Sequence, residues 1–179
     1  LIRYLLNVCI RSRSLQDSLI ALDTLNLLHK SRKIRKLIER MWQEETKRSR
    51  EWRGTSYEES IKEVAQSRLK QITIENDVET LAYGLLIANE LNDQFLTEIS
   101  KLLFRKMEPF WKIIFKGKTD EVRPILYDLS MALRALSLSP FINSVFIPFE
   151  QSEYVYEAIA WYEEKKRKGI IPITTVSYT

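Results

Sequence analysis

The sequence predicts an all-α fold, a compact bundle of about seven to eight helices with a short extended C-terminal tail. Two observations support this prediction. Apolar residues recur at helical spacing along most of the chain. The 179 residues also include only four glycines, where average usage would give roughly 12, so turn-dense β folds and glycine-rich phosphate loops are not expected. We predict one helical-bundle domain over 1–169 and an extended tail over 170–179.

The first two predicted helices cover 1–10 and 15–28. Each carries a broad apolar stripe, and Ser14 is placed to act as the N-cap of the second helix. The single cysteine, Cys9, lies within the apolar residues of the first helix, which predicts a small buried side chain.

The most regular helical pattern begins after Ser31. Its apolar residues follow the i, i+3, i+4, i+7, i+8 spacing of one buried face: Ile34, Leu37, Ile38, Met41 and Trp42. The stretch 53–55 contains a glycine and is expected to end this helix. Ser56 and Glu59 then form a capping-box pattern, which predicts the start of the next helix.

A long helix is predicted to begin at Asn76 or Asp77 and to continue to about Lys106. Gly84 lies within its apolar stripe, where the absence of a side chain permits close approach of another helix, although a kink is the alternative. Pro109 is expected to end the helical run, because proline lacks the backbone donor and clashes with the preceding turn.

The remaining chain is predicted to contain a short apolar helix over 110–115 and a longer helix over 119–138. The apolar segment 141–149 could be a short helix or an extended packing segment. A last helix is predicted over 152–168, with Gly169 as the residue after its C-cap. The basic residues of 165–168 fit a helix C-terminus better than a second binding site.

Charge is divided unevenly along the chain. The net charge is +4, from 28 Lys and Arg against 24 Asp and Glu. Residues 1–53 hold 13 basic and six acidic residues, a net charge of +7, and the remainder holds 15 and 18, a net charge of −3. A field of one sign on one part of a protein favours contact of that part with a polyanion.

Helical projection of the segment after Ser31 places four cations on the edge opposite the apolar face. These residues, which we call the basic rail, are Lys33, Lys36, Arg40 and Lys47. Arg32 and Arg50 lie beside the rail, and three further arginines could extend the basic surface: Arg11, Arg13 and Arg53. At 1.5 Å per residue the rail extends about 21 Å, long enough for three or four phosphates of a nucleic-acid strand.

Two alternatives stay open for these residues. The rail could be an ordinary solvated helix face whose cations pair at i, i+4 with the acids of the same helix: Glu39, Glu44 and Glu45. Trp52 stands among arginines and could stack on an unpaired base, but the packing of its indole against the bundle core is the favoured interpretation.

No constellation for catalysis or metal binding is apparent. The chain has one histidine, His29, and one cysteine, so neither a catalytic dyad nor a zinc site is indicated. His29 is interpreted as a surface or capping residue. We therefore expect no enzyme activity, no metal and no cofactor.

The basic segment Lys30–Arg53 and the run Leu81–Ala88, in a helical chain of this size, resemble a small subunit of a type I CRISPR surveillance complex (Cascade). The likeness is to the helical C-terminal part of a type I-D or I-B large subunit. Such small subunits can be translated from an internal start, which fits a chain that begins with Leu1. The resemblance implies a non-catalytic subunit that contacts target DNA or the displaced strand of the R-loop, while guide RNA reads the sequence.

The expected partners are nucleic acid and other subunits of a complex that includes guide RNA, with self-association into a short filament also considered. No apolar run approaches the roughly 18 residues of a membrane span, and no secretory signal is evident, so a cytoplasmic protein without membrane contact is expected. The alternative function is a helical adaptor or scaffold subunit that docks through the segment Pro109–Pro148 and does not touch nucleic acid.

Overall fold

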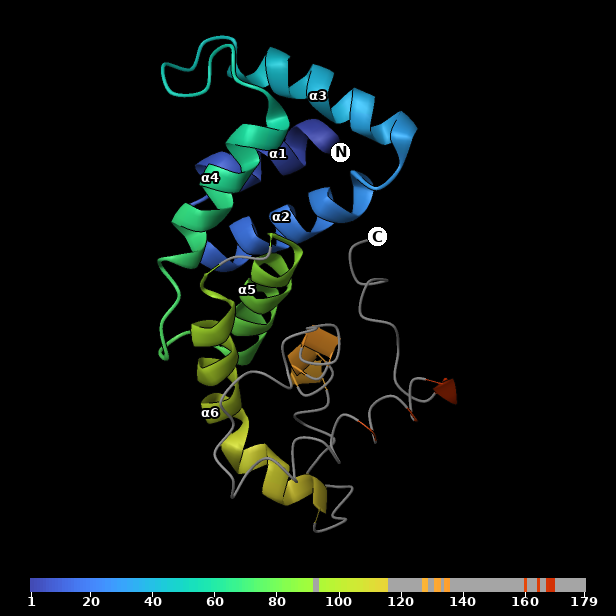
Figure 1. Cartoon of the computed structure of the whole chain (residues 1–179), viewed down its shortest axis with the longest axis vertical. Helices are drawn as coiled ribbons and strands as arrows, with labels where there is room; N and C mark the ends of the chain where they lie inside the picture. Colours follow the sequence, from blue (N-terminus) through green and yellow to red (C-terminus); the bar gives the residue numbers. More distant parts are fainter. Residues whose placement is uncertain are drawn as a thin grey trace. The chain divides into compact units, whose positions relative to one another are not determined.

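The computed structural model describes residues 1–91 and 94–115 and short stretches beyond them, at 127–128, 131–132, 134–135, 160, 164 and 167–169. The helices are α1 (Ile2–Arg11), α2 (Leu15–Leu28), α3 (Arg32–Thr46), α4 (Tyr57–Leu69), α5 (Val78–Leu91) and α6 (Leu96–Phe115) (Figure 1). No strand occurs in these residues, so the all-α class is confirmed for the part of the chain described here. The prediction of seven to eight helices stays a prediction, and the tail 170–179 lies outside the described residues.

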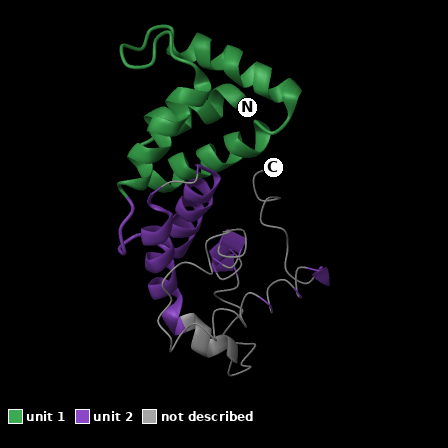
Figure 2. Cartoon of the chain, viewed as in Figure 1, with its two compact units in different colours: residues 1–71 green, residues 72–179 purple. Residues whose placement is uncertain are grey.

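The chain divides into two compact units, Leu1–Gln71 and Ile72–Thr179 (Figure 2). The prediction of a single domain over 1–169 stays a prediction beside this division. Unit 1 contains α1 to α4, with α1 packed on both α2 and α3, and with α4 packed on α2 and α3. Unit 2 contains α5, which packs on α6.

Two predicted N-caps of unit 1 are confirmed. The Ser14 hydroxyl accepts a hydrogen bond of 3.2 Å from the backbone N–H of Asp17, and α2 begins at the next residue. The Ser56 hydroxyl accepts one of 3.3 Å from the N–H of Glu59 at the start of α4. Each bond satisfies one of the backbone donors that a helix N-terminus leaves without a partner, which explains why these helices begin where they do.

An arginine holds the end of α1 in place. Arg68 of α4 donates hydrogen bonds to the backbone carbonyls of Cys9 and Ile10, at 3.3 and 2.9 Å. It also donates to the Ser18 hydroxyl at 2.9 Å, and Ser18 in turn donates to the Cys9 carbonyl. The last carbonyls of α1 lack partners within the helix, so this guanidinium both satisfies them and joins three helices of unit 1.

Gly84 of α5 permits a close approach, as its place in the apolar stripe predicts. A Cβ atom at this position would overlap the Ile72 side chain and would lie 3.8 Å from Cγ2 of Ile99 in α6. The start of α5 is capped by Asp77, whose carboxylate accepts a hydrogen bond of 2.9 Å from the N–H of Thr80. This agrees with one of the two predicted caps.

The predicted long helix through Lys106 is wrong, because two helices, α5 and α6, occupy that stretch. The sequence between them includes Asn92 and Asp93, which have low helix propensity because their side chains compete for backbone hydrogen bonds. The prediction that Pro109 ends a helix is also wrong: α6 continues through it to Phe115. Pro109 lies on an exposed face of α6, where the backbone carbonyl that loses its partner can be hydrated.

Near the end of the chain, Gly169 has a φ of +72°, the left-handed conformation expected of the residue after a C-cap. Lys168 forms an ion pair of 2.8 Å with Glu164 one turn earlier, as basic residues at a helix end do. The described stretches within 119–138 are helical, whereas the segment 141–149 lies outside the described residues.

Candidate nucleic-acid interface

One face of α3 is fixed by a cluster of aromatic rings in the core of unit 1. Trp42 is fully buried, and its ring lies edge-on to those of Trp52 and Tyr57, with centroids 6.0 and 5.9 Å apart. The Trp42 indole N–H donates a hydrogen bond of 3.0 Å to the Thr55 carbonyl. Because this ring anchors α3 at its centre, the residues on the opposite side of the helix must face solvent.

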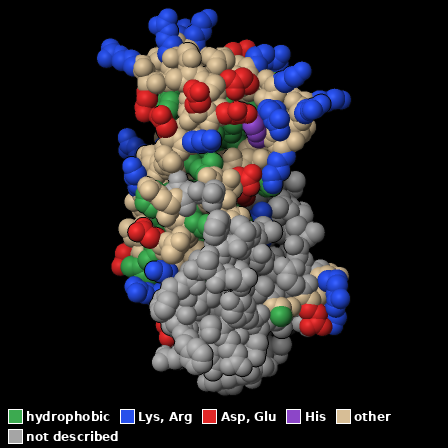
Figure 3. Space-filling view, in the orientation of Figure 1, with side chains coloured by type: hydrophobic (Ala, Val, Ile, Leu, Met, Phe, Trp, Pro, Cys, Tyr) green, Lys and Arg blue, Asp and Glu red, His purple; other side chains and the backbone are tan. Residues whose placement is uncertain are grey.

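The basic rail lies on that opposite side. All four of its members are exposed, and so are the five arginines predicted to accompany them: Arg11, Arg13, Arg32, Arg50 and Arg53. Figure 3 shows Lys and Arg side chains gathered over the end of unit 1 that α3 and the following loop form. Within the described part of the chain, none of these nine side chains forms an ion pair.

The acids of α3 contact other elements instead of the rail. Glu44 and Glu45 form ion pairs of 3.0 and 2.9 Å with Arg3 of α1, and Glu45 also accepts from the Asn7 amide at 3.2 Å. Glu39 accepts hydrogen bonds of 3.1 and 3.2 Å from the backbone N–H of Tyr57. The i, i+4 pairs that the solvated-face alternative expects are therefore not formed among the described residues, and the rail keeps its positive charge.

The helix that carries the rail is shorter than predicted. It ends at Thr46, whose hydroxyl donates a hydrogen bond of 2.7 Å to the Trp42 carbonyl. Lys47 is the C-cap with helical backbone angles, so the spacing of the four rail residues is kept. Arg50 and Arg53, however, lie in the loop that leads to Gly54, whose φ of +76° marks a sharp turn. The projected place of Arg50 beside the rail was wrong, because no helix extends that far.

Arg11 and Arg13 lie at the far end of α1. Arg11 is the last residue of that helix, one residue beyond the predicted end at residue 10, and it donates a hydrogen bond of 2.7 Å to the Asn7 amide oxygen. The neighbouring Ile10 lines the same pocket as Trp52. The structure therefore brings Arg11 to the end of unit 1 that also carries the loop arginines Arg50 and Arg53.

Trp52 packs in the core, as the favoured interpretation has it. Its side chain is 8% exposed and contacts the Trp42 ring. The backbone around it is held by local bonds, including one of 3.1 Å from the Trp52 N–H to the Ser49 hydroxyl. A base cannot stack on an indole that is already covered by protein, so the candidate interface consists of cations without an aromatic platform.

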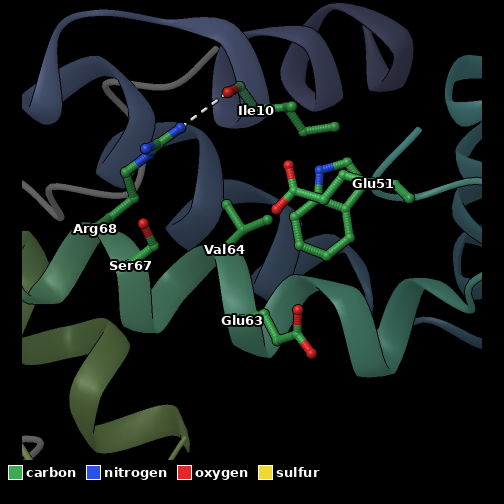
Figure 4. A pocket seen from close by; sticks show the side chains of 7 residues that line it. Ile10, Glu51, Glu63, Val64, Ser67 and Arg68 are labelled. Carbon is green, nitrogen blue, oxygen red and sulfur yellow. Dashed lines mark hydrogen bonds between the residues drawn. The ribbon is translucent and has the colours of Figure 1, made fainter. Parts of the chain in front are cut away.

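A pocket of about 330 Å³ lies beside Trp52 (Figure 4). Its polar walls come from the carboxylates Glu51 and Glu63, the Ser67 hydroxyl and the guanidinium of Arg68. The N–H groups of Arg68 are engaged by the end of α1, and its charge together with the two carboxylates gives the pocket a net charge of −1. This charge disfavours a phosphate, and the pocket is not part of the proposed interface.

The two residues considered for catalysis or metal binding, His29 and Cys9, are both packed into unit 1. His29 is the C-cap of α2, its ring lies 5.3 Å from that of Tyr57, and its Nε2 is 3.8 Å from the Glu58 carboxylate. Cys9 is fully buried, and burial raises the pKa of its thiol to about 12, so it is not a thiolate near neutral pH. Among the described residues, no three His, Cys, Asp or Glu side chains lie close enough to hold a metal.

Sequence reasoning missed Arg3 and Arg68, the two arginines that organise unit 1. No signal in the sequence marks Arg3 as the partner of two glutamates 41 and 42 residues later, because helix packing alone brings them together.

Comparison with known proteins found no match to this chain among family models, curated proteins or solved structures. Within the described residues, no helix is both long and apolar enough to cross a lipid bilayer.

Proposed function

We propose that this chain is a non-catalytic nucleic-acid-binding protein that holds a sugar-phosphate backbone along the basic rail of α3. One observation supports this proposal above the others. The four rail cations are exposed and unpaired among the described residues, while the acids of the same helix are engaged by α1 and α4. A helix that only needed a solvated face would gain from pairing these charges with one another.

The proposed mechanism is electrostatic. Each phosphate that a rail cation neutralises releases counterions, which favours binding. This favourable contribution becomes smaller as the salt concentration rises. Contacts from lysine and arginine to phosphates carry no sequence information, so binding of this kind does not depend on sequence. The rail also extends about 21 Å along one helix edge, which matches an extended strand better than a single compact phosphate group.

The resemblance to small subunits of type I CRISPR surveillance complexes gives this activity a setting. We propose that the chain holds the target DNA or the displaced strand in the R-loop while guide RNA pairing reads the sequence. Residues 54–179, with a net charge of −3, would then face other subunits of the complex, and self-association into a short filament belongs to the same proposal.

The test is a charge reversal with a matched control. The rail variant carries Lys33→Glu, Lys36→Glu, Arg40→Glu and Lys47→Glu. The control variant reverses four other exposed cations: Lys62, Lys70, Lys101 and Arg105. Both variants have the same net charge, so a difference between them reports position and not total charge.

Binding is measured by fluorescence anisotropy with a labelled 30-nucleotide single strand and with the corresponding duplex. The rail variant is expected to lose roughly two orders of magnitude in affinity at low salt, and the control variant much less. Equal losses in the two variants would mean that only net charge matters, and the rail would then have no special role. If neither variant changes binding, the strand is held elsewhere on the chain, and if the unmodified chain does not bind either probe, the adaptor alternative is favoured.

A further inference from the structure

An apolar groove of about 660 Å³ lies at the other end of unit 1 from the pocket at Trp52. Its lining residues come from the start of α1, the end of α2, and α3 as far as Met41. The lining residues are Leu1, Ile2, Arg3, Leu28, Ile34, Leu37 and Met41. Six of these seven side chains are apolar, and a groove of this size can hold several apolar side chains of a partner.

The groove arises because the apolar stripe of α3 is wider than the core of unit 1 requires. Ile38 and Trp42 are fully buried in the core. The other residues of the stripe, Ile34, Leu37 and Met41, are only half-buried and face the groove. Apolar residues left accessible side by side in a concave surface are typical of a site for another molecule, whereas scattered exposed apolar residues are not.

One edge of the groove is positively charged. Arg3, the one cation in the lining, does not contribute to this charge, because it pairs with both Glu44 and Glu45 and the three side chains sum to −1. By helical spacing, Lys33 and Arg40 lie about 40 to 60° around α3 from Leu37, and both are exposed without an ion pair among the described residues. An apolar floor with free cations along one edge complements a ligand that is apolar on one side and acidic beside it.

Two other occupants fit less well. A nucleobase would need an aromatic face on which to stack, and the lining contains none. A second copy docked groove to groove would bring the two positive rims together, at a cost in electrostatic energy.

We propose that the groove binds an amphipathic helix of a partner protein, with apolar residues at i, i+3 or i+4, and i+7, and with acidic residues beside them. Helices of this kind commonly bind in apolar grooves between helices. Met41 suits the role because its unbranched thioether adapts to side chains of different shape. This site adjoins the proposed phosphate contacts and shares Lys33 and Arg40 with them, whereas its apolar floor belongs to the groove alone.

The chain offers an internal reporter for this proposal. It contains three methionines: Met41 in the groove, and Met107 and Met131, which are fully buried in unit 2. In the full chain labelled with ¹³C-methyl methionine, the NMR spectrum therefore shows one groove signal and two reference signals. The probe is a synthetic 16-residue helix with leucines at i, i+3, i+4 and i+7 and glutamates elsewhere on its surface.

We expect the acidic peptide to shift the Met41 signal alone. Two control peptides should not do so: one with lysines in place of the glutamates, and one with the leucine spacing scrambled. In anisotropy measurements, Leu37→Gln is expected to weaken binding of the acidic peptide by roughly tenfold. The matched control is Tyr4→Gln, which removes a large exposed side chain that does not line the groove and should leave binding unchanged.

Several results would overturn the proposal. One is a Met41 shift of the same size with the basic or scrambled peptide. Another is a shift with single-stranded DNA and none with the acidic peptide, which would assign the groove to nucleic acid. A third is a shift that depends on protein concentration without any peptide, which would indicate a second copy. The circular-dichroism melting curve of Leu37→Gln shows whether that variant is folded, and the peptide comparison on the unmodified chain needs no variant.

Discussion

At the scale of single residues, Arg3 determines how much positive charge the rail presents. It lies on α1 but pairs with both glutamates at the end of α3, and Glu45 is only 17% exposed in this pair. Without Arg3, the carboxylates of Glu44 and Glu45 on the same helix would have no cation opposite them, and the net charge near the rail would be lower by one. An arginine that touches no ligand can thus control the binding surface.

The substitution Arg3→Gln is expected to weaken single-strand binding by about threefold to tenfold at low salt, because it removes one positive charge and leaves Glu44 and Glu45 without a cation beside them. It should also lower the free energy of unfolding by no more than about 1 kcal/mol, since Arg3 and Glu44 are largely exposed. Anisotropy and urea unfolding measure the two effects. Arg3→Lys should retain most of the binding, and adding Glu44→Gln and Glu45→Gln to Arg3→Gln should restore it. Unchanged binding in Arg3→Gln would contradict this role.

The burial of Cys9 makes a second prediction at this scale. Because burial raises the pKa of the thiol to about 12, the folded protein should react with a thiol reagent such as Ellman's reagent far more slowly than the urea-unfolded chain at pH 8. The same raised pKa makes the folded protein less stable at high pH. The contribution of the protonated thiol to the free energy of unfolding is complete below about pH 9 and is lost as the pH rises towards 12. Rapid labelling of the folded protein at pH 8 would show that Cys9 is accessible.

The exposure of the basic residues could be predicted from the sequence, and their lack of partners could not. Helical spacing alone places Lys33, Lys36 and Arg40 opposite Trp42, because every residue of a helix has a fixed angular position. Whether a neighbouring glutamate pairs with them depends on whether α1 and α4 supply that glutamate with another ion pair or hydrogen bond. Such long-range contacts cannot be predicted from the spacing of residues within one helix.

At the scale of elements, α3 was predicted well at its start and poorly at its end. Its apolar stripe correctly identified a buried face, but the sequence did not show that Ile38 and Trp42 fill the core while Ile34, Leu37 and Met41 line a groove. The width of a stripe does not reveal how much of it the neighbouring helices cover.

The two errors in unit 2 have local causes. Apolar residues continue at helical spacing on both sides of Asn92 and Asp93, so the stripe predicts one helix where the structure has α5 and α6. Pro109 predicts a helix end, but a proline on an exposed face can be accommodated by an otherwise favourable helix.

The close approach at Gly84 predicts that a larger residue there destabilises unit 2. Gly84→Leu should lower the free energy of unfolding by about 1–3 kcal/mol, because the new side chain would overlap Ile72 and press on Ile99. Gly84→Ala should lose less, since alanine gains about 1 kcal/mol of helix propensity and displaces only the flexible end of Ile72. Urea unfolding followed by circular dichroism gives both values.

The control for this prediction is Glu90→Leu, which adds the same side chain at an exposed position of α5 and should change stability by less than about 0.5 kcal/mol. A Gly84→Leu protein as stable as this control would mean that no close approach exists at Gly84.

At the scale of the whole molecule, charge and structure divide at nearly the same place. Unit 1 holds 16 Lys and Arg against nine Asp and Glu, a net charge of +7, and unit 2 has a net charge of −3. Composition predicted this asymmetry from the sequence. The division into two compact units was not predicted, because the sequence around residues 71 and 72 contains no glycine-rich or proline-rich linker.

The salt dependence of single-strand binding tests the central claim most directly. If the four rail residues each neutralise one phosphate, log K against log [NaCl] for the full chain has a slope of about −3 or steeper. Replacing all four with glutamine should reduce the magnitude of that slope by about 3, because the released counterions are lost with the contacts. An unchanged slope in the glutamine variant would show that the strand is held elsewhere, and would contradict the account.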